Sequence, residues 1–258
     1  MRVTLNDPSV NVQDILAFVE KAYWDGNEAA VSIQSVPLLV RTGFRPTRNG
    51  VYLFPLPRFK RIAHTPVYER AAALLLLVLL SPLLLLVSLL VLCDGGLPIF
   101  YSQRRSGRNN RPFTIWKFRT MVNASGNMQE ELLRTSSRSD RLFKMADDPR
   151  VTRIGAVLRK TFIDELPQLV NIINGEMRFF GPRPLPAFEH GHYQRRNQSL
   201  RLISVPGLSG VWQVSGRNRH TFDEMCLLDY YGICHSSFGF NTLLFFRTLK
   251  VAFAAKGY

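Results

Sequence analysis

The chain has 258 residues, of which 46% are hydrophobic and 20% are charged. This balance excludes a disordered or a fibrous protein and allows a sizeable core. Lysine and arginine number 33 against 19 acidic residues, and the net charge of +14 suits a polyanionic partner such as nucleic acid, anionic lipid or a phosphorylated substrate. Charge alone does not choose among these three kinds of partner.

Residues 1–65 predict a soluble extension in which no chemistry is visible. Val12 to Trp24 has the spacing of a helix, and Ala29 to Val40 has the composition of a strand that Pro37 interrupts. Arg41 to Arg61 is rich in Pro, Gly and Arg, which is typical of a linker. We therefore expect an extension over residues 1–65 and a main domain over residues 66–258.

An uncharged hydrophobic segment runs from Ala71 to Cys93. It is long enough to span a bilayer and lies too far from the N-terminus to be a signal peptide. Ser81 and Pro82, near its middle, predict a bend or break, because proline removes a backbone donor and clashes with the preceding turn. The serine hydroxyl can bond a carbonyl that the break leaves free.

Basic residues flank this hydrophobic segment on both sides. They are Arg58, Lys60, Arg61 and Arg70 before it, and Arg104, Arg105, Arg108 and Arg111 after it. The positive-inside rule places both groups in the cytoplasm, which a straight span cannot do. We therefore favour a re-entrant hairpin, and the alternative is a single span kinked at the proline.

Two short strands and a helix are expected after the hairpin. Leu97 to Tyr101 and Pro112 to Met121 have strand composition, and Lys117 and Arg119 in the second should point to one face. Ser125 to Arg138 is expected to be helical. The three cysteines, which form no CxxC pair, favour a reduced, cytosol-facing compartment.

Near the C-terminus, Leu243 to Ala255 predicts an amphipathic helix in the membrane interface. It places Arg247 and Lys250 on one helical face and phenylalanine and leucine below them. The alternative is a core helix of the soluble part. The expected fold class is α+β, with a membrane hairpin, surface helices and a small sheet or irregular core.

The segment from Arg159 to Gly175 holds the candidate catalytic residues. Asp164 and Glu165 fall at the start of a predicted helix that Gly175 is placed to end. Its apolar face is formed by Leu166, Leu169, Val170 and Ile173. Acidic residues at a helix N-terminus are common because they complement the helix dipole by about 0.3–1 kcal/mol, so this placement alone does not indicate catalysis.

Basic residues near this helix favour a functional interpretation. Arg159 precedes it, and Arg183 follows on the stiff turn Gly181–Pro184. An ionised carboxylate can attack phosphorus, and arginines can bind diphosphate oxygens in pairs of hydrogen bonds. Asp164 and Glu165 could also hold Mg²⁺, which takes one or two carboxylates together with phosphate oxygens. We therefore predict a phosphoryl-transfer site.

An ordered series of motifs then becomes recognisable along the chain. It comprises the Ser81-Pro82 break, the strand Pro98–Tyr101, Gly107–Met121, Asp148–Gly155, Asp164–Gln168, Gly181–Pro184 and Pro206–Arg217. In this order they make the stretch from about Val67 to Lys250 resemble the bacterial sugar transferase family. These are the monotopic phosphoglycosyl transferases that begin exopolysaccharide and O-antigen assembly. The resemblance covers more than two-thirds of the chain.

The resemblance implies a reaction and a role for each candidate residue. In the family, the aspartate attacks the β-phosphate of a UDP-sugar, releases UMP and forms a phosphosugar–enzyme intermediate, which polyprenyl (undecaprenyl) phosphate then attacks. The family pattern makes Asp164 the nucleophile and Glu165 its partner in base or Mg²⁺ work. It also implies that Arg159 and Arg183 bind phosphates and that Lys117 and Arg119 line the same site.

The resemblance further implies a setting for this reaction. The catalytic domain would lie on the cytoplasmic face of the bacterial inner membrane, with a UDP-sugar, polyprenyl phosphate and membrane lipid as partners and no nucleic acid. The short architecture resembles rhizobial exopolysaccharide initiators, which indicates galactose or glucose. His235–Ser237 and Asn241 depart from the family's Asn-Trp-Ser and Asp, so the family does not predict the C-terminal membrane or acceptor contacts. An inactive member acting as a scaffold is the alternative.

Overall fold

The computed structural model describes residues 3–5, 12–17, 31–33, 38–39, 42–44, 52–54, 64–122, 150–186, 196–216 and 220–254. Its α-helices are α4 (Val67–Leu79), α5 (Ser81–Gly95), α7 (Arg153–Thr161), α8 (Leu169–Ile173), α9 (Val211–Val214), α10 (Phe222–His235) and α11 (Phe238–Phe253). Its 3-10 helices are η1 (Arg108–Asn110), η2 (Ile163–Gln168) and η4 (Arg196–Ile203). Its strands are β1 (Val3–Leu5), β2 (Val31–Ile33), β3 (Tyr52–Phe54), β4 (Phe100–Ser106), β5 (Pro112–Phe118), β6 (Arg178–Phe180) and β7 (Gly207–Ser209).

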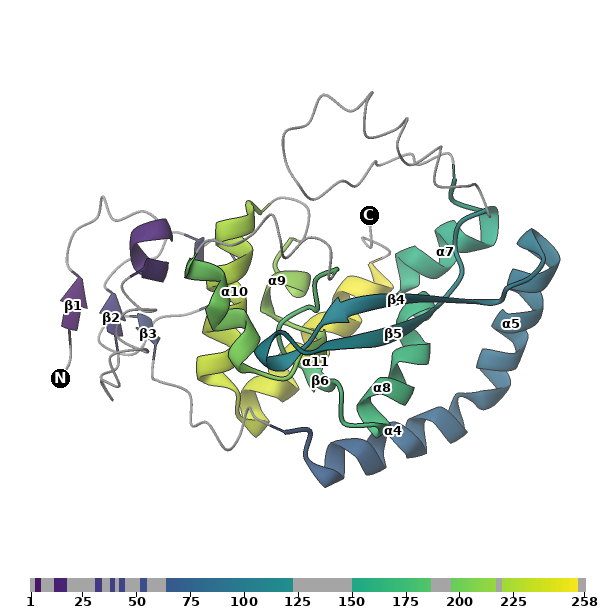
Figure 1. Cartoon of the computed structure of the whole chain (residues 1–258), viewed down its shortest axis with the longest axis horizontal. Coiled ribbons are helices and arrows are strands. Elements are labelled where there is room, and N and C mark those ends of the chain that lie inside the picture. Colours follow the sequence, from purple (N-terminus) through teal and green to yellow (C-terminus); the bar gives the residue numbers. More distant parts are fainter. Residues whose placement is uncertain are drawn as a thin grey trace.

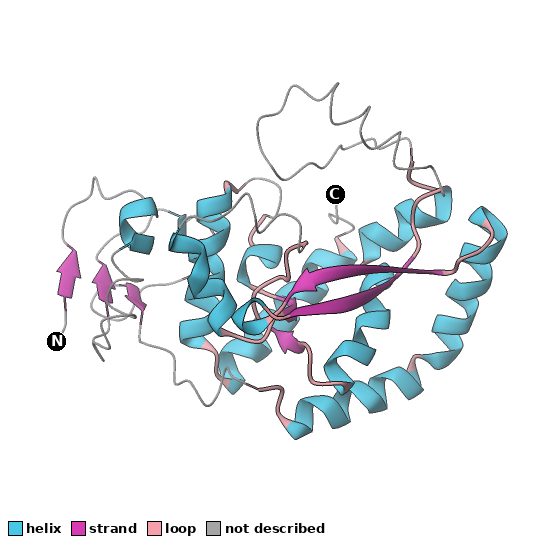
Figure 2. Ribbon diagram, in the orientation of Figure 1, coloured by secondary structure: helices cyan, strands magenta, loops and turns pink. Residues whose placement is uncertain are grey.

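The described strands form small, separate sheets, and the mixture of helices and strands agrees with the expected class. β4 and β5 are antiparallel in full register, from Phe100 opposite Phe118 to Ser106 opposite Pro112. β6 pairs with β7 in parallel, and β2 joins β1 in parallel and β3 in antiparallel orientation. The β4–β5 ribbon runs through the middle of the molecule, and β1–β3 lie at the end beyond α10 (Figure 1). Helices surround the ribbon (Figure 2).

The hydrophobic segment forms two helices, α4 and α5, that meet at an angle of 62°. The break falls where the sequence predicts it, because Pro82 lies in the first turn of α5 and the Ser81 hydroxyl donates to the Val78 carbonyl at 2.7 Å. The pair forms a bent arm on the outside of the molecule (Figure 1). Among the described helices, none alone has the length and hydropathy to cross a membrane, whereas this bent pair meets both criteria together.

Most leucines of the bent arm are exposed, while a few side chains along its inner face bind the rest of the protein. Glu69, at the start of α4, accepts hydrogen bonds from the Arg178 guanidinium and from the Phe179 amide at 3.0 Å. Asp94, at the end of α5, accepts the Ile154 amide of α7 at 2.9 Å. Both ends of the arm are thus attached to the same body.

Three groups of buried apolar side chains stabilise the fold. The largest joins α10, η4 and α9 to parts of residues 12–44, including Leu16, Leu39 and Phe44. A second lies between α4, β5 and α8, and a third between α5, β5 and α7. Each fully buried aliphatic or aromatic side chain contributes about 1.5–3 kcal/mol of transfer free energy. The second and third groups fix α8 and α7 against β5, on either side of the candidate carboxylates.

The structure corrects several expectations for the N-terminal part. Among the residues described within the strand expected over Ala29–Val40, Val31–Ile33 form β2 and residues 38–39 are helical. β3 lies within the stretch expected to be a linker. Residues 12–17 are helical as predicted, and the rest of the helix expected up to Trp24 lies outside the described residues, as does the helix expected over Ser125–Arg138. The proline and glycine content therefore predicted too long a linker, because β3, which contacts α10, lies within it.

Two strands and the last helix also differ in extent. The first strand begins at Phe100 rather than Leu97 and continues to Ser106. The second ends at Phe118, so Arg119 follows it. α11 begins at Phe238, five residues before the predicted start, because the Ser237 hydroxyl caps it by accepting the Phe240 amide at 3.3 Å.

Candidate active site

The candidate carboxylates lie in a tight turn between α7 and α8. Thr152 caps the start of α7, because its hydroxyl accepts the Gly155 amide at 3.0 Å. Phe162 follows the last residue of α7 and adopts a left-handed conformation with φ of 61°. Bulky residues rarely adopt this conformation, which costs about 1–3 kcal/mol. The chain then enters the 3-10 helix η2, in which Asp164 and Glu165 are both buried.

The helix predicted to start at Asp164 is therefore a 3-10 turn followed by the short helix α8. Pro167 fits inside η2, and Gly175 follows the helix with φ of +83°, as its predicted role as a helix terminator requires. The predicted apolar face is wrong at one position, since Val170 is exposed while Ile172 is fully buried. The 3-10 geometry rotates the face relative to an α-helix, because it has three residues per turn rather than 3.6.

Glu165 is held by two basic side chains from distant parts of the chain. Lys117 of β5 donates to its Oε1 at 2.8 Å, and Arg183 donates to Oε1 at 2.6 Å and to Oε2 at 3.1 Å. Burial alone raises the pKa of Glu165, but the charges of Arg183 and Lys117 and their hydrogen bonds outweigh it and hold this pKa well below its usual range. Glu165 is therefore ionised at neutral pH.

Asp164, the neighbouring residue, has different surroundings. Within the described part of the chain its carboxylate makes no hydrogen bond; it feels the charges of Lys117, Arg183 and Arg159 from a distance. Burial, followed by repulsion from Glu165, raises the pKa of Asp164 to about 6 despite these three cations. At neutral pH the side chain is mostly ionised and its oxygens are free of donors, which is the state that a carboxylate nucleophile needs.

The structure brings together Lys117, Arg159 and Arg183 around the two carboxylates, as predicted, and places Arg119 elsewhere. Arg159 lies in the last turn of α7, and its Nε donates to the Thr120 hydroxyl at 2.7 Å. The Arg119 guanidinium is buried and donates to the backbone carbonyls of Gly96 and Leu97. Arg119 therefore holds the end of α5 and does not line the carboxylate site.

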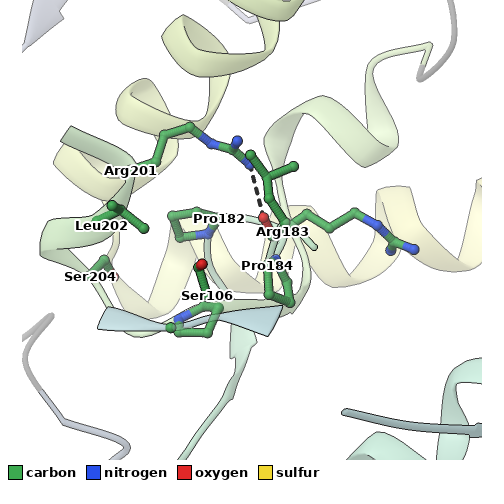
Figure 3. A pocket seen from close by; sticks show the side chains of 10 residues that line it. Ser106, Pro182, Arg183, Pro184, Arg201, Leu202 and Ser204 are labelled. Atoms are coloured by element: carbon green, nitrogen blue, oxygen red, sulfur yellow. Dashed lines mark hydrogen bonds between the residues drawn. The ribbon is translucent and has the colours of Figure 1, made fainter. Parts of the chain in front are cut away.

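Arg183 is positioned by a turn that other residues support from behind. Pro182 and Pro184 flank it, and Arg105 donates to the Pro184 carbonyl at 3.1 Å. The Arg201 guanidinium donates to the Arg183 carbonyl at 2.9 Å. Figure 3 shows this bond, with the Arg183 side chain extending away from the hollow that Arg201 and Ser106 line. The supporting residues contact the backbone of the turn, whereas the Arg183 side chain contacts Glu165.

Sequence reasoning did not single out two of the residues behind the site. Arg201 forms a buried ion pair with Asp229 of α10, at 2.7 Å between the guanidinium and Oδ2. Burial raises the pKa of Asp229 to about 6, although the Arg201 charge and hydrogen bond act in the opposite direction. A signal existed in the sequence, because an aspartate within the apolar run Met225–Tyr231 would be buried in a helix and would need a partner.

The carboxylate site suits Mg²⁺ binding through Asp164 alone rather than through Asp164 and Glu165 together. Both oxygens of Glu165 already accept hydrogen bonds from cationic side chains, whereas those of Asp164 accept none from the described residues. In the part of the chain that the structure describes, no group of three acidic, histidine or cysteine side chains converges. Mg²⁺ often binds through one carboxylate together with substrate phosphates, and Asp164 is the residue here that can supply it.

The site thus combines three cationic side chains with a buried carboxylate that accepts no hydrogen bond from the described residues. Two carboxylates and three basic groups leave a local positive charge, which suits a phosphorylated substrate. An ionised aspartate in such surroundings is able to act as a nucleophile. These features make the site chemically suited to a phosphorylated ligand.

Comparison with known proteins identifies the family. The model of the bacterial sugar transferase family matches residues 60–255. The galactosyl transferase CpsE of Streptococcus agalactiae is 42% identical over 165 residues, which are 64% of this chain and 36% of that protein. The exopolysaccharide production protein ExoY of Sinorhizobium fredii is 40% identical over 177 residues, 66% of this chain and 76% of that protein. The chain belongs to the bacterial sugar transferase family, a family of transferase enzymes.

Some relatives are considerably longer than this chain. The undecaprenyl-phosphate galactose phosphotransferase of Salmonella typhimurium is 36% identical over 168 residues, which are 64% of this chain but 35% of that protein. The chain thus matches about a third of CpsE and of this phosphotransferase. The matched family region includes the hydrophobic arm, both carboxylates and the three cationic residues that surround them.

Proposed function

We propose that the chain transfers a hexose-1-phosphate from a UDP-sugar to polyprenyl (undecaprenyl) phosphate and releases UMP, through a covalent intermediate on Asp164. The observation that carries this proposal is the difference between the two carboxylates. Glu165 is neutralised by Lys117 and Arg183, while Asp164 beside it is ionised and accepts no hydrogen bond from the described residues. Two relatives support the donor and acceptor classes by their names, the UDP-galactose-lipid carrier transferase of Erwinia amylovora and the undecaprenyl-phosphate galactose phosphotransferase of Salmonella typhimurium.

The first step forms the covalent intermediate. An oxygen of Asp164 attacks the β-phosphorus of the donor, the bond from that phosphorus to the bridging oxygen breaks, and UMP leaves with the electron pair. Arg183, Lys117 and Arg159 surround the reacting carboxylate and offset the negative charge of the diphosphate as it approaches. Glu165 keeps Lys117 and Arg183 beside Asp164, which is a different role from that of a general base.

The second step transfers the phosphosugar to the lipid. An oxygen of polyprenyl phosphate attacks the same phosphorus, the bond to Asp164 breaks, and the carboxylate is regenerated with the polyprenyl-diphosphate sugar as product. An ionised phosphate needs no base to remove a proton, which agrees with the paired state of Glu165. Dividing the transfer into two steps lets a soluble donor and a membrane acceptor use one site in turn.

Mg²⁺ is part of the proposal, and Asp164 would hold it together with phosphate oxygens of the donor. When bound, it would supply charge neutralisation to the diphosphate. Glu165 is not assigned to the metal, because Lys117 and Arg183 hold its oxygens.

The proposed location is the cytoplasmic face of the bacterial inner membrane, with α4 and α5 as a re-entrant hairpin. The support is the attachment of both ends of the arm to one body, through Glu69 and Asp94. A catalytic body cannot lie on both sides of a bilayer, so an arm held in this way must return to the side from which it entered. The exposed leucines between those ends give the arm a surface that suits acyl chains.

The sugar proposed is galactose or glucose, and the step is the first membrane step of exopolysaccharide synthesis. The support comes from the names of relatives. They include a galactosyl transferase, a UDP-galactose-lipid carrier transferase of Erwinia amylovora and an undecaprenyl-phosphate glucose phosphotransferase of Komagataeibacter xylinus.

UMP release tests the proposal. Purified protein in a membrane mimetic is given Mg²⁺, undecaprenyl phosphate and a panel of UDP-sugars, and wild type is compared with Asp164→Asn. We expect UMP from wild type with UDP-galactose or UDP-glucose and none from the variant. A phosphosugar adduct on wild type, seen by intact-protein mass spectrometry with donor alone, would identify the intermediate. Folded wild-type protein that releases no UMP with any sugar would overturn the proposal in favour of an inactive scaffold.

A further inference from the structure

A buried ion pair lies behind the turn that carries Arg183. Asp229 Oδ2 accepts the Arg201 guanidinium at 2.8 Å from Nε and 2.7 Å from Nη2, and both side chains are almost completely buried. The same Arg201 Nη2 also donates to the Arg183 carbonyl at 2.9 Å. The pair therefore contacts the backbone of the residue whose side chain binds Glu165.

These bonds form a continuous path from α10 to Glu165, the residue next to the proposed nucleophile. Asp229 on α10 holds Arg201 on η4, Arg201 holds the backbone of Arg183, and the Arg183 guanidinium binds both oxygens of Glu165. Pro182 and Pro184 restrict the turn on either side, so a shift of the Arg183 backbone is passed on to its side chain. Each connection joins residues that are distant in sequence.

The energetics argue that this pair does more than stabilise the core. Removing two charges from water costs several kcal/mol per ion, and a well-packed apolar pair of similar volume is often as stable. Here the cost is not fully recovered, because Asp229 Oδ1 is buried and has no hydrogen-bond partner among the described residues. An apolar pair would fill the same space but could not donate to the Arg183 carbonyl.

We infer that Arg201 and Asp229 are positioning residues that hold the Arg183 turn so that the Arg183 guanidinium stays on Glu165 beside Asp164. This inference rests on the proposed function, since it assigns the pair a role in that transfer. Neither residue contacts the two carboxylates, and both act through Arg183. A misplacement of about 1 Å in a catalytic group can cost up to about 100-fold in rate.

The test replaces the pair by apolar residues so that no buried charge is left alone. Arg201→Met with Asp229→Leu is expected to keep the thermal midpoint close to that of wild type, while UMP release falls about 10- to 100-fold. The loss should appear in kcat and not in the thermal midpoint, and it should depend on the Arg183 side chain. A purely structural role would lower stability and would not depend on Arg183.

Two further comparisons complete the test. In an Arg183→Ala background, the apolar pair should cause no additional loss of kcat, because the residue through which it acts is gone. Leu227→Ala, which removes a fully buried side chain on the same helix, is the matched control; it should lower the thermal midpoint, and its effect on kcat should be the same with and without the Arg183 side chain. If the apolar pair does not fold, Arg201→Lys, which keeps the charge but loses the forked donor, takes its place.

A folded variant with wild-type kcat would overturn the inference, as would an equal loss of kcat in the Arg183→Ala background. Failure of the proposed function looks different, since wild type itself would then release no UMP. The two failures are therefore distinguishable in one series of assays.

Discussion

Asp164 and Glu165 are adjacent in the chain, yet their carboxylates differ in protonation behaviour. Glu165 points to Lys117 and Arg183 and takes direct hydrogen bonds from both, so its pKa falls despite burial. Asp164 is equally buried but accepts no hydrogen bond from the described residues. The charges of the cations lower its pKa, and burial and the charge of Glu165 raise it. The pair therefore separates into a fixed anchor for basic side chains and a carboxylate available for attack.

This difference predicts the pH dependence of the reaction. The raised pKa of Asp164, about 6, means that the nucleophile is ionised above that pH and protonated below it. We expect kcat/KM to be level above about pH 7 and to fall about tenfold per pH unit below the pKa. Profiles of UMP release between pH 5 and 8 measure this limb.

Glu165→Gln should move this limb in a defined direction. The variant removes a negative charge that raises the pKa of Asp164 and leaves Lys117 and Arg183 in place, so the limb should move to lower pH while kcat falls. The conservative variant Glu165→Asp keeps the charge and serves as control, with a limb near that of wild type. A limb that stays in place in Glu165→Gln would mean that a group other than Asp164 controls it.

At the scale of elements, the packing of α7 against the chain at the end of β5 determines where the carboxylates lie. Gly155, in the first turn of α7, packs against the backbone at Thr120, and a Cβ at this position would lie 2.3 Å from the Thr120 carbonyl oxygen. Thr120 in turn binds Arg159 through its hydroxyl. The close approach of α7 to the end of β5 therefore brings Arg159 towards Asp164.

Gly155→Ala should consequently weaken both stability and activity. The added methyl group would push α7 away from β5, because backbone atoms cannot give way as a flexible side chain can. We expect a loss of about 1–3 kcal/mol in unfolding free energy and a clear fall in UMP release. Gly239→Ala in α11, where a Cβ meets no atom within 4 Å, is the matched control and should be tolerated. Equal behaviour of the two variants would contradict this account.

The bent arm allows a direct test of topology. His64 precedes α4 and Leu97 follows α5, and both are exposed. In a Cys93→Ser background, His64→Cys and Leu97→Cys should both react with a membrane-impermeant maleimide in inverted inner-membrane vesicles and neither should react in intact cells. A single kinked span would place the two cysteines on opposite sides, so labelling of one from each side would exclude the re-entrant hairpin.

At the scale of the whole molecule, the N-terminal residues that the structure describes belong to the main core. Phe44 is buried against Tyr231 and Phe240, and its ring lies 4.3 Å below the Arg247 guanidinium. Arg247 also donates to the carbonyls of Thr42 and Gly43. The basic face expected to meet lipid headgroups is thus partly used inside the protein, since Arg247 holds the N-terminal segment on α11.

This packing predicts that the N-terminal segment stabilises the catalytic domain. Phe44→Ala should lower the unfolding free energy by about 3–5 kcal/mol, because it leaves a cavity between α10 and α11 and removes the contact with Arg247. Phe238→Ala, at an exposed phenylalanine of α11, is the control. Chemical unfolding in detergent compares the two, and an equally small effect of both would mean that the segment is a separate extension.

The sequence by itself determined the features that depend on local rules. The Ser81-Pro82 break follows from the missing amide of proline, and β5 follows from its β-branched and aromatic composition. The adjacent Asp164 and Glu165, with basic residues nearby in the sequence, indicate the carboxylate site. Such features need only a few neighbouring residues, and each has a small set of possible conformations.

Only the tertiary structure decided which partners these residues meet. Lys117 reaches Glu165 across 48 positions of the sequence and Arg201 reaches Asp229 across 28, whereas Arg119, two residues after Lys117, turns to the end of α5. No local sequence signal predicts the left-handed conformation of Phe162 or the packing of Phe44. The same holds for the burial of Ile172 in the core while Val170 is exposed. The physical reason is that burial and hydrogen bonding depend on contacts between segments that are far apart in the chain, and charge and periodicity along the sequence do not specify those contacts.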